Sequence, residues 1–201
     1  MKKIVIAWVA SVLGLVALFA FIGGDLLSKP RNDLELGEGA ALINAEFTLQ
    51  DASGKTVKAS DFRGRYLLVY FGFTHCPDIC PTSLLLMSNA LEQLGAKAAK
   101  IQPIFITVDP ERDTPKLVGT YVSHFGKNFV GLTGTPAQVK QAADNFKVFY
   151  SKVDTKESAL GYVVDHSGFI YLMGPDGKYV AHFPFTVSEQ ELSQGLQRYV
   201  R

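Results

Sequence analysis

The two cysteines of this 201-residue chain lie close together, at Cys76 and Cys80, in the segment FGFTHCPDICP. An apolar run with the length of a buried strand, 66–73, comes just before them, and a helical pattern over 82–94 follows. The order is therefore strand, turn and helix, with both thiols at the turn. Such a pair can hold a soft metal ion, or it can exchange electrons as a dithiol and disulfide.

The spacing of the two thiols bears on that choice. In a helical turn, Cys76 and Cys80 face the same side, and Pro81 suits the first position of a helix. The positive end of the helix dipole then favours thiolate, which is both a nucleophile and a ligand for Cu(I). Thioredoxins use C-x-x-C, and the extra residue here leaves room for a metal ion between the sulfurs. A purely structural disulfide would close a very short loop and stabilise little.

Hydrophobic patterns predict alternating strands and helices along the rest of the chain. Thr135 before Pro136 is an N-cap signal, and Ser188 with Glu191 forms a capping box. The predicted elements are a hairpin at 46–50 and 56–58, strands at 66–73, 103–108 and 129–132, helices at 82–94, 116–125 and 136–146, a hairpin at 169–173 and 178–183, and a last helix after 188. This order predicts an α/β, thioredoxin-like fold, with a central mixed sheet flanked by helices.

The N-terminus predicts a transmembrane helix. Lys2 and Lys3 precede an uncharged run, Ile4 to Ile22, which spans about 28 Å as a helix, close to the thickness of the bilayer core. The alternative is a cleaved signal peptide, although the run is long for one and no clean cleavage site follows. We therefore expect an anchor or signal peptide over 1–24, a linker over 25–40 and a thioredoxin-like domain over 41–201.

Charge and composition limit the partners and the compartment. The chain is 47% hydrophobic and 19% charged, which is typical of a globular protein. Its formal net charge of +1, without a basic stripe, argues against nucleic acid as a partner. Lysines before the anchor stay cytoplasmic, so the domain should face the periplasm from a bacterial inner membrane. A mitochondrial location is less favoured because no transit peptide precedes the anchor.

A bound metal ion would need a third ligand besides the two sulfurs. The four histidines are the candidates: His75, His124, His166 and His182. His166 stands in YVVDHS, directly before the predicted second hairpin, where thioredoxins carry a cis-proline close to the cysteine turn. Spacing alone leaves the choice open. Asp78 and Asp165, beside these residues, either form turns or orient the ligands and tune the charge of the site.

Three segments together are more specific. YFGFTHCPDICPTSL, ITVDPERDTP and VDHSGFIYLMGPDG, in this order, resemble the Sco/SenC family of copper-binding assembly proteins for cytochrome c oxidase. The likeness covers nearly all of the chain after about residue 40. It implies a membrane-anchored, thioredoxin-like protein whose copper ion, Cu(I) or Cu(II), is held by Cys76, Cys80 and His166. The implied partners are subunit II of cytochrome c oxidase, whose dinuclear copper centre matures with this help, and other copper chaperones.

Three functions compete at this point. The first is a metallochaperone without turnover, which passes copper on by ligand exchange. The second is a membrane-anchored thiol–disulfide oxidoreductase that uses Cys76 and Cys80 to reduce the cysteines of the oxidase copper site. Oxidation of the pair would switch off metal loading, so the two can coexist. A peroxidase of the peroxiredoxin kind ranks third. The DPERDTP segment is either a docking surface or a plain loop.

Overall fold

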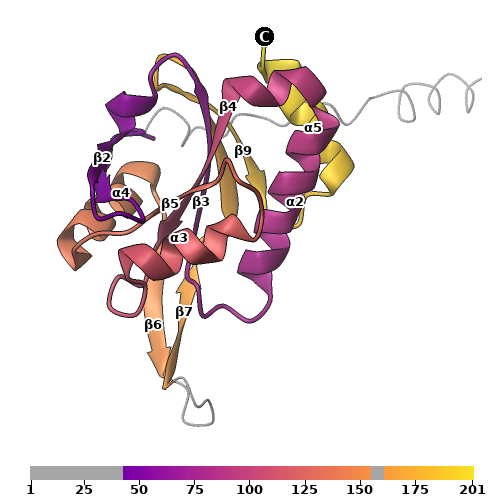
Figure 1. The fold of residues 1–201 in the computed structure, drawn as a ribbon. Helices are drawn as coiled ribbons and strands as arrows, with labels where there is room; N and C mark the ends of the chain where they lie inside the picture. Colours follow the sequence, from indigo (N-terminus) through magenta and orange to yellow (C-terminus); the bar gives the residue numbers. More distant parts are fainter. Residues whose placement is uncertain (1–42, 155–160) are drawn as a thin grey trace, which may run out of the picture. The chain divides into compact units, whose positions relative to one another are not determined.

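The computed structural model describes residues 43–154 and 161–201 (Figure 1). The predicted anchor over 1–24 and linker over 25–40 lie outside the described residues. Within the described part, no helix is long and apolar enough to span a bilayer. All described elements fall within the predicted domain of 41–201.

A five-stranded mixed sheet forms the centre of the domain (Figure 1). Within this sheet, the three strands that come earliest in the sequence pair in parallel. The two later strands pair antiparallel, one against an earlier strand and both against each other. In spatial order they are β5 (Val130–Leu132), β4 (Ile101–Thr107), β3 (Tyr66–Gly72), β8 (Phe169–Met173) and β9 (Tyr179–Pro184). The predicted mixed sheet and all five of its strands are confirmed.

The two middle strands, β3 and β4, make the core. Every residue of β4 is buried, and in β3 only Tyr66 is partly exposed. A parallel pair with both faces covered excludes water from each side chain, so both strands must be apolar almost throughout. The unbroken apolar runs of the sequence are the direct consequence of this position.

In the described part of the chain, four α-helices flank the sheet, and Figure 1 shows α2 and α5 side by side. Asn89 of α2 donates a hydrogen bond to Glu189 of α5 at 2.9 Å. The helices are α2 (Ile79–Gln93), α3 (Pro115–Ser123), α4 (Pro136–Phe146) and α5 (Glu189–Tyr199). The predicted caps are confirmed, since the hydroxyls of Thr135 and Ser188 accept from the backbone N–H of the third helical residue.

The helix after the cysteines begins earlier than predicted. Its first residue is Ile79, so Cys80 is the second residue of α2 and Pro81 the third, not the first. The prediction of a start at Pro81 was wrong because the first four N–H groups of a helix need no intrahelical partner, and proline is tolerated throughout that turn.

The remaining short elements lie around this core. An N-terminal hairpin joins β1 (Thr48–Gln50) to β2 (Thr56–Lys58), as predicted. Two 3-10 helices follow, η2 (Ala59–Phe62) and η3 (Gly95–Lys100).

A second small sheet was not among the predicted elements. Strands β6 (Tyr150–Asp154) and β7 (Tyr162–His166) form an antiparallel pair separate from the main sheet. The pair projects at the bottom of Figure 1. His166 is the last residue of β7 and lies opposite Tyr150. This hairpin therefore carries the histidine that the sequence singles out.

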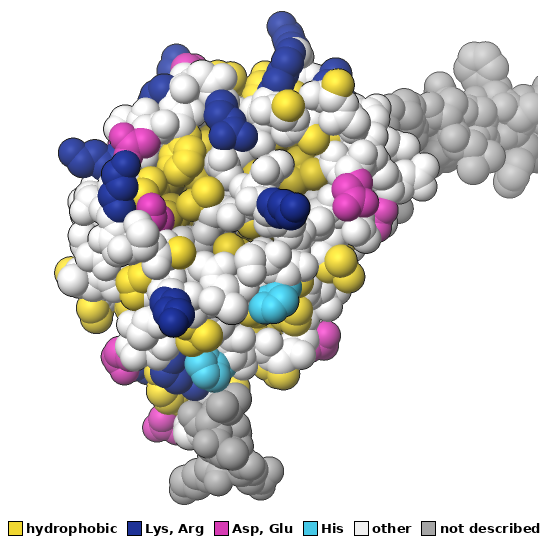
Figure 2. Space-filling model, in the orientation of Figure 1, with side chains coloured by type: hydrophobic (Ala, Val, Ile, Leu, Met, Phe, Trp, Pro, Cys, Tyr) yellow, Lys and Arg dark blue, Asp and Glu magenta, His cyan; other side chains and the backbone are white. Residues whose placement is uncertain are grey.

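The face drawn in Figure 2 has no single dominant charge: basic and acidic side chains are scattered, and hydrophobic side chains show between them. Several large apolar side chains of the domain are exposed. Those nearest in sequence to the cysteines are Ile79 and Leu85, and the one nearest to His166 is Phe169.

Candidate metal centre

The cysteine turn joins β3 to α2. Cys76 is half-buried in the turn, and Cys80 is fully buried in the first turn of α2. The backbone N–H of Cys80 points at the Cys76 sulfur, with an N···Sγ distance of 3.4 Å. Both cysteines are free thiols. The pair is therefore reduced, with Cys76 half-buried and Cys80 enclosed.

Gly72 at the end of β3 makes room for the enclosed sulfur. A Cβ atom on Gly72 would lie 2.8 Å from Cys80 Sγ and 2.9 Å from Phe105 Cε2. Contacts this short are essentially never seen, so any side chain here would displace the sulfur or the ring. In the sequence, the only sign of this role is that Gly72 interrupts the apolar run between Phe71 and Phe73. That sign was missed in the sequence-based prediction.

His166 reaches the cysteines from the far end of β7. Its Nε2 lies 3.5 Å from Cys80 Sγ. Its Nδ1 lies 3.2 Å from the carbonyl oxygen of Ser167. A proton on Nδ1 donates to this carbonyl and leaves the Nε2 lone pair facing the sulfur. The rings of Phe73 and Tyr70 meet the imidazole edge-on, each at 6.1 Å between centroids.

The two thiols have opposite acidities. The pKa of Cys76 falls from 9.0 to about 5, chiefly because the Cys80 thiol donates a hydrogen bond to it, with help from the N–H groups of Asp78 and Cys80 and from His166. The pKa of Cys80 rises well above its ordinary value, because it shares that hydrogen bond and is buried. Cys76 is thus the thiolate at neutral pH, and Cys80 keeps its proton.

The other three histidines make different contacts. The Nδ1 atom of His75 lies 3.1 Å from the hydroxyl of Thr74. His124 is exposed near the end of α3. The Nδ1 atom of His182, on β9, lies 2.6 Å from the hydroxyl of Tyr179. Among the contacts of the described residues, His166 is the histidine that meets a cysteine sulfur.

The two aspartates expected beside the ligands are both exposed. Asp78 precedes α2 and makes no side-chain cap, but its backbone N–H donates to the Cys76 sulfur. Asp165 pairs with Ser151 in the hairpin. Within the described part of the chain, no polar contact joins its carboxylate to His166, whose Nδ1 faces Ser167 instead.

The three candidate ligands are neighbours, but they are not arranged around one point. Residues 43–154 and 161–201 contain no group of three or more His, Cys, Asp or Glu side chains in a ready arrangement for a metal ion. The Cys80 thiol donates its hydrogen bond to the Cys76 sulfur, and the imidazole approaches Cys80. A metal ion between the three would replace the hydrogen bond from the Cys80 thiol to Cys76.

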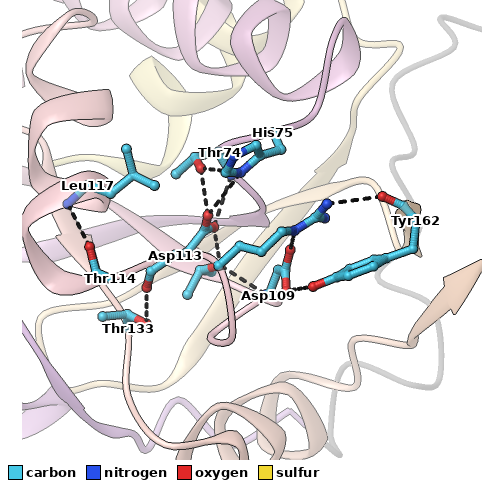
Figure 3. A network of polar contacts seen from close by, with 10 residues as sticks. Thr74, His75, Asp109, Asp113, Thr114, Leu117, Thr133 and Tyr162 are labelled. Carbon is cyan, nitrogen blue, oxygen red and sulfur yellow. Dashed lines mark hydrogen bonds and ion pairs between the residues drawn. The ribbon is translucent and has the colours of Figure 1, made fainter. Parts of the chain in front are cut away.

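The loop after β4 contacts the segment just before the cysteines, and Figure 3 shows Asp113 beside Thr74 and His75. Its two aspartates, Asp109 and Asp113, are fully buried. Asp113 accepts hydrogen bonds from the backbone N–H of Thr74 at 2.9 Å and from the hydroxyl of Thr107 at 2.5 Å. The DPERDTP segment, whose role the sequence left open, therefore turns its aspartates into the protein and ties down the strand end before the cysteines.

Comparison with known proteins identifies the family of the chain. The family model SCO1/SenC matches residues 36–201. The SCO2-like protein of Rickettsia felis is 39% identical over 196 residues, covering 97% of this chain and 95% of that protein. The structure of Bradyrhizobium japonicum ScoI with copper bound is 41% identical, covering 78% of this chain and 99% of that chain, with a TM-score of 0.70. BsSco, in which a disulfide switch was identified and which is described as a member of the Sco family of cytochrome c oxidase assembly proteins, is 26% identical. That match covers 80% of this chain and 95% of that chain, with a TM-score of 0.61. The chain belongs to the SCO1/SenC family.

Proposed function

We propose that this protein carries one copper ion on Cys76, Cys80 and His166 and delivers it to cytochrome c oxidase. The observation that supports this most is the approach of His166 Nε2 to Cys80 Sγ, at 3.5 Å across 86 positions of sequence. Two thiolates and one imidazole suit Cu(I) and can also hold Cu(II). The copper-bound structure of a relative with 41% identity supports copper as the cargo.

The unequal thiols suggest how the ion enters and leaves. Cys76 is a half-exposed thiolate, so an arriving copper ion meets it first. Cys80 must release its proton to bind as thiolate, which makes loading depend on pH. Departure begins at the same exposed edge, where a partner ligand replaces Cys76 on the copper ion. We propose copper chaperones as donors and oxidase subunit II, at its dinuclear copper centre, as the acceptor.

Copper titration of the reduced full-length chain tests the site. One ion per chain should bind, and His166→Ala should weaken binding and change the absorption spectrum of the Cu(II) form. The matched control is His124→Ala, which removes an exposed imidazole on another element. Binding by His166→Ala with the affinity and spectrum of the wild type would overturn the assignment of this ligand.

Thiol–disulfide exchange is the second candidate function, and the difference between the two thiols favours it. The Cys76 thiolate would attack a disulfide of the partner, forming a mixed disulfide and releasing one partner thiolate. Cys80 would then lose its proton and attack Cys76 Sγ, forming the Cys76–Cys80 disulfide and releasing the second thiolate. Two electrons pass to the partner, which takes up two protons.

A trapping experiment separates this activity from copper delivery. Cys80→Ser should stop the reaction at the mixed disulfide on Cys76, visible as a covalent complex with an oxidised subunit II fragment. His166→Ala should still reduce that fragment, because exchange needs no imidazole ligand. A reduced wild-type protein that leaves the disulfide of the fragment intact would eliminate the reductase.

We also propose that residues 1–24 anchor the protein in the bacterial inner membrane, with 25–40 as linker and the domain in the periplasm. The support is the apolar run behind Lys2 and Lys3. Intact-mass analysis of protein extracted from the membrane distinguishes an anchor, which keeps the N-terminus, from a signal peptide, which is lost.

A further inference from the structure

The β6–β7 hairpin carries His166 but belongs to a sheet of its own. Its place relative to the cysteines must therefore come from side chains as well as from the chain connection at its base. Besides packing against the core, it is contacted by polar side chains of the loop after β4. We call Asp109, Arg112 and Tyr162 the Tyr162 latch (Figure 3).

Four contacts join the members of the Tyr162 latch. The hydroxyl of Tyr162 donates to Asp109 Oδ1 at 2.9 Å. Arg112 donates from Nη1 to the Tyr162 carbonyl oxygen at 3.1 Å and from Nε to Asp109 Oδ2 at 2.5 Å. The guanidinium also stacks on the Tyr162 ring, 3.7 Å from its centroid. Arg112 thus fixes both the backbone and the ring of one residue of β7.

Burial makes these contacts stiff. The side chain of Asp109 is fully buried and that of Arg112 is 17% exposed. A charged pair in such a place keeps its geometry, because any departure leaves a charge without a partner at high cost. An outer ion pair, Lys152 to Glu111 at 2.6 Å, adds a tie between β6 and the same loop.

The Tyr162 latch reaches His166 by two routes. Along β7, Tyr162 and His166 are four residues apart and so lie on the same face of the strand. Through space, Arg112 also approaches the ring of Phe73, 5.9 Å from its centroid, and Phe73 packs perpendicular to the imidazole. The Tyr162 latch therefore holds in place the strand that bears the imidazole, and it contacts the Phe73 ring that packs against the imidazole.

The same loop also contacts the segment that carries the cysteines. Asp113, four residues after Asp109, binds Thr74 through both the backbone N–H and the hydroxyl. Thr74 lies two residues before Cys76. One loop, 109–113, thus contacts both ligand-bearing segments, with Asp113 on the cysteine side and the Tyr162 latch on the histidine side.

We propose that the Tyr162 latch is a positioning device for the metal centre, which sets the approach of His166 to the two sulfurs. This inference rests on the proposed function of Cys76, Cys80 and His166. None of the three latch residues is a proposed metal ligand. They act by holding β7 in place, as the outer hydrogen-bond partners of metal ligands do.

The test is Tyr162→Phe in the full-length chain, which removes one hydroxyl and keeps the ring under Arg112. Copper affinity should fall about 10-fold, with a changed Cu(II) spectrum. The matched control is Tyr66→Phe, which also removes one hydroxyl, bonded at 3.1 Å to the Tyr199 carbonyl oxygen. Tyr66 lies at the opposite end of β3 from the cysteines, so the Tyr66→Phe protein should bind copper with the affinity of the wild type.

A double-mutant cycle shows whether the effect passes through the imidazole. In a His166→Ala background, Tyr162→Phe should cause no further loss of copper affinity. An equal loss with and without His166 would overturn the proposal, as would an unchanged affinity in Tyr162→Phe when His166→Ala is defective.

Metal-free protein gives a readout that does not depend on the proposed function. If His166→Ala binds copper normally, the proposed ligand set fails, and the Tyr162 latch is judged by NMR. The imidazole signals of His166 should shift in metal-free Tyr162→Phe and stay in place in Tyr66→Phe. Unchanged signals in Tyr162→Phe would overturn the positioning role itself.

Discussion

Gly72→Ala adds one methyl group at the end of β3 and should disturb the metal centre by pushing against the Cys80 sulfur. The added Cβ would stand 2.8 Å from Cys80 Sγ, and ordinary contact begins at 3.4 Å. The sulfur, or the strand behind it, must therefore move by about 0.6 Å. The same Cβ would also stand 2.9 Å from Phe105 Cε2, so it has two close contacts to relieve.

This displacement has two measurable costs. Overpacking of a tight core costs about 1–3 kcal/mol, and about 2 kcal/mol lowers the Tm of a domain of this size by about 4–8 °C. Metal–ligand distances tolerate about 0.2 Å, so a sulfur moved by about 0.6 Å should weaken copper binding. We expect a loss of about 10-fold or more, measured by competition with a chelator of known affinity.

Gly131→Ala is the matched control, because it overpacks the same sheet on β5. Its Cβ would lie 2.7 Å from Val118 Cγ1 and 2.9 Å from the Val118 carbonyl oxygen. This variant should lose a similar amount of stability and bind copper with unchanged affinity. Wild-type copper affinity in a folded Gly72→Ala protein would refute the reasoning, since Cys80 would then not depend on the space left by the glycine.

Four further outcomes follow from the same structure. Iodoacetamide should label Cys76 rapidly down to about pH 5, where its thiolate takes up a proton, and should spare buried Cys80 in the folded protein; mass spectrometry of a pH series checks both. Folded Cys76 gives up its proton near pH 5 and the unfolded thiol near pH 9.0, so the unfolded chain binds more protons in between. The free energy of unfolding should rise with pH over that interval and lose this rise in Cys76→Ser, as measured in urea. Phe146→Ala empties a fully buried site against Phe71 and should cost about 3–5 kcal/mol in the same assay, and a cost below about 1 kcal/mol would contradict the packing. Thr135→Ala should cost about 1 kcal/mol through the lost N-cap of α4, whereas Thr135→Ser should be close to neutral.

Local sequence patterns were sufficient for most of the fold. The apolar run at 66–73 and the cap signals at Thr135 and Ser188 act over a few residues, and the structure confirms each of them. The hairpin β6–β7 escaped prediction for a physical reason. Three of the five residues of β6 are exposed, so no apolar alternation marks it. It is held by pairing and by the loop 109–113, which are contacts over long sequence separations.

The sequence by itself determined the strand, turn and helix around the cysteines, because each of those choices depends on neighbouring residues. Spacing left four histidines open and the family resemblance pointed to His166, but only the tertiary structure brings its imidazole to Cys80, 86 positions away in the sequence. It also decided that Asp109 and Asp113 turn inward. Burial of a carboxylate depends on partners such as Tyr162 and Thr74, which come from other segments, and no local pattern carries that information.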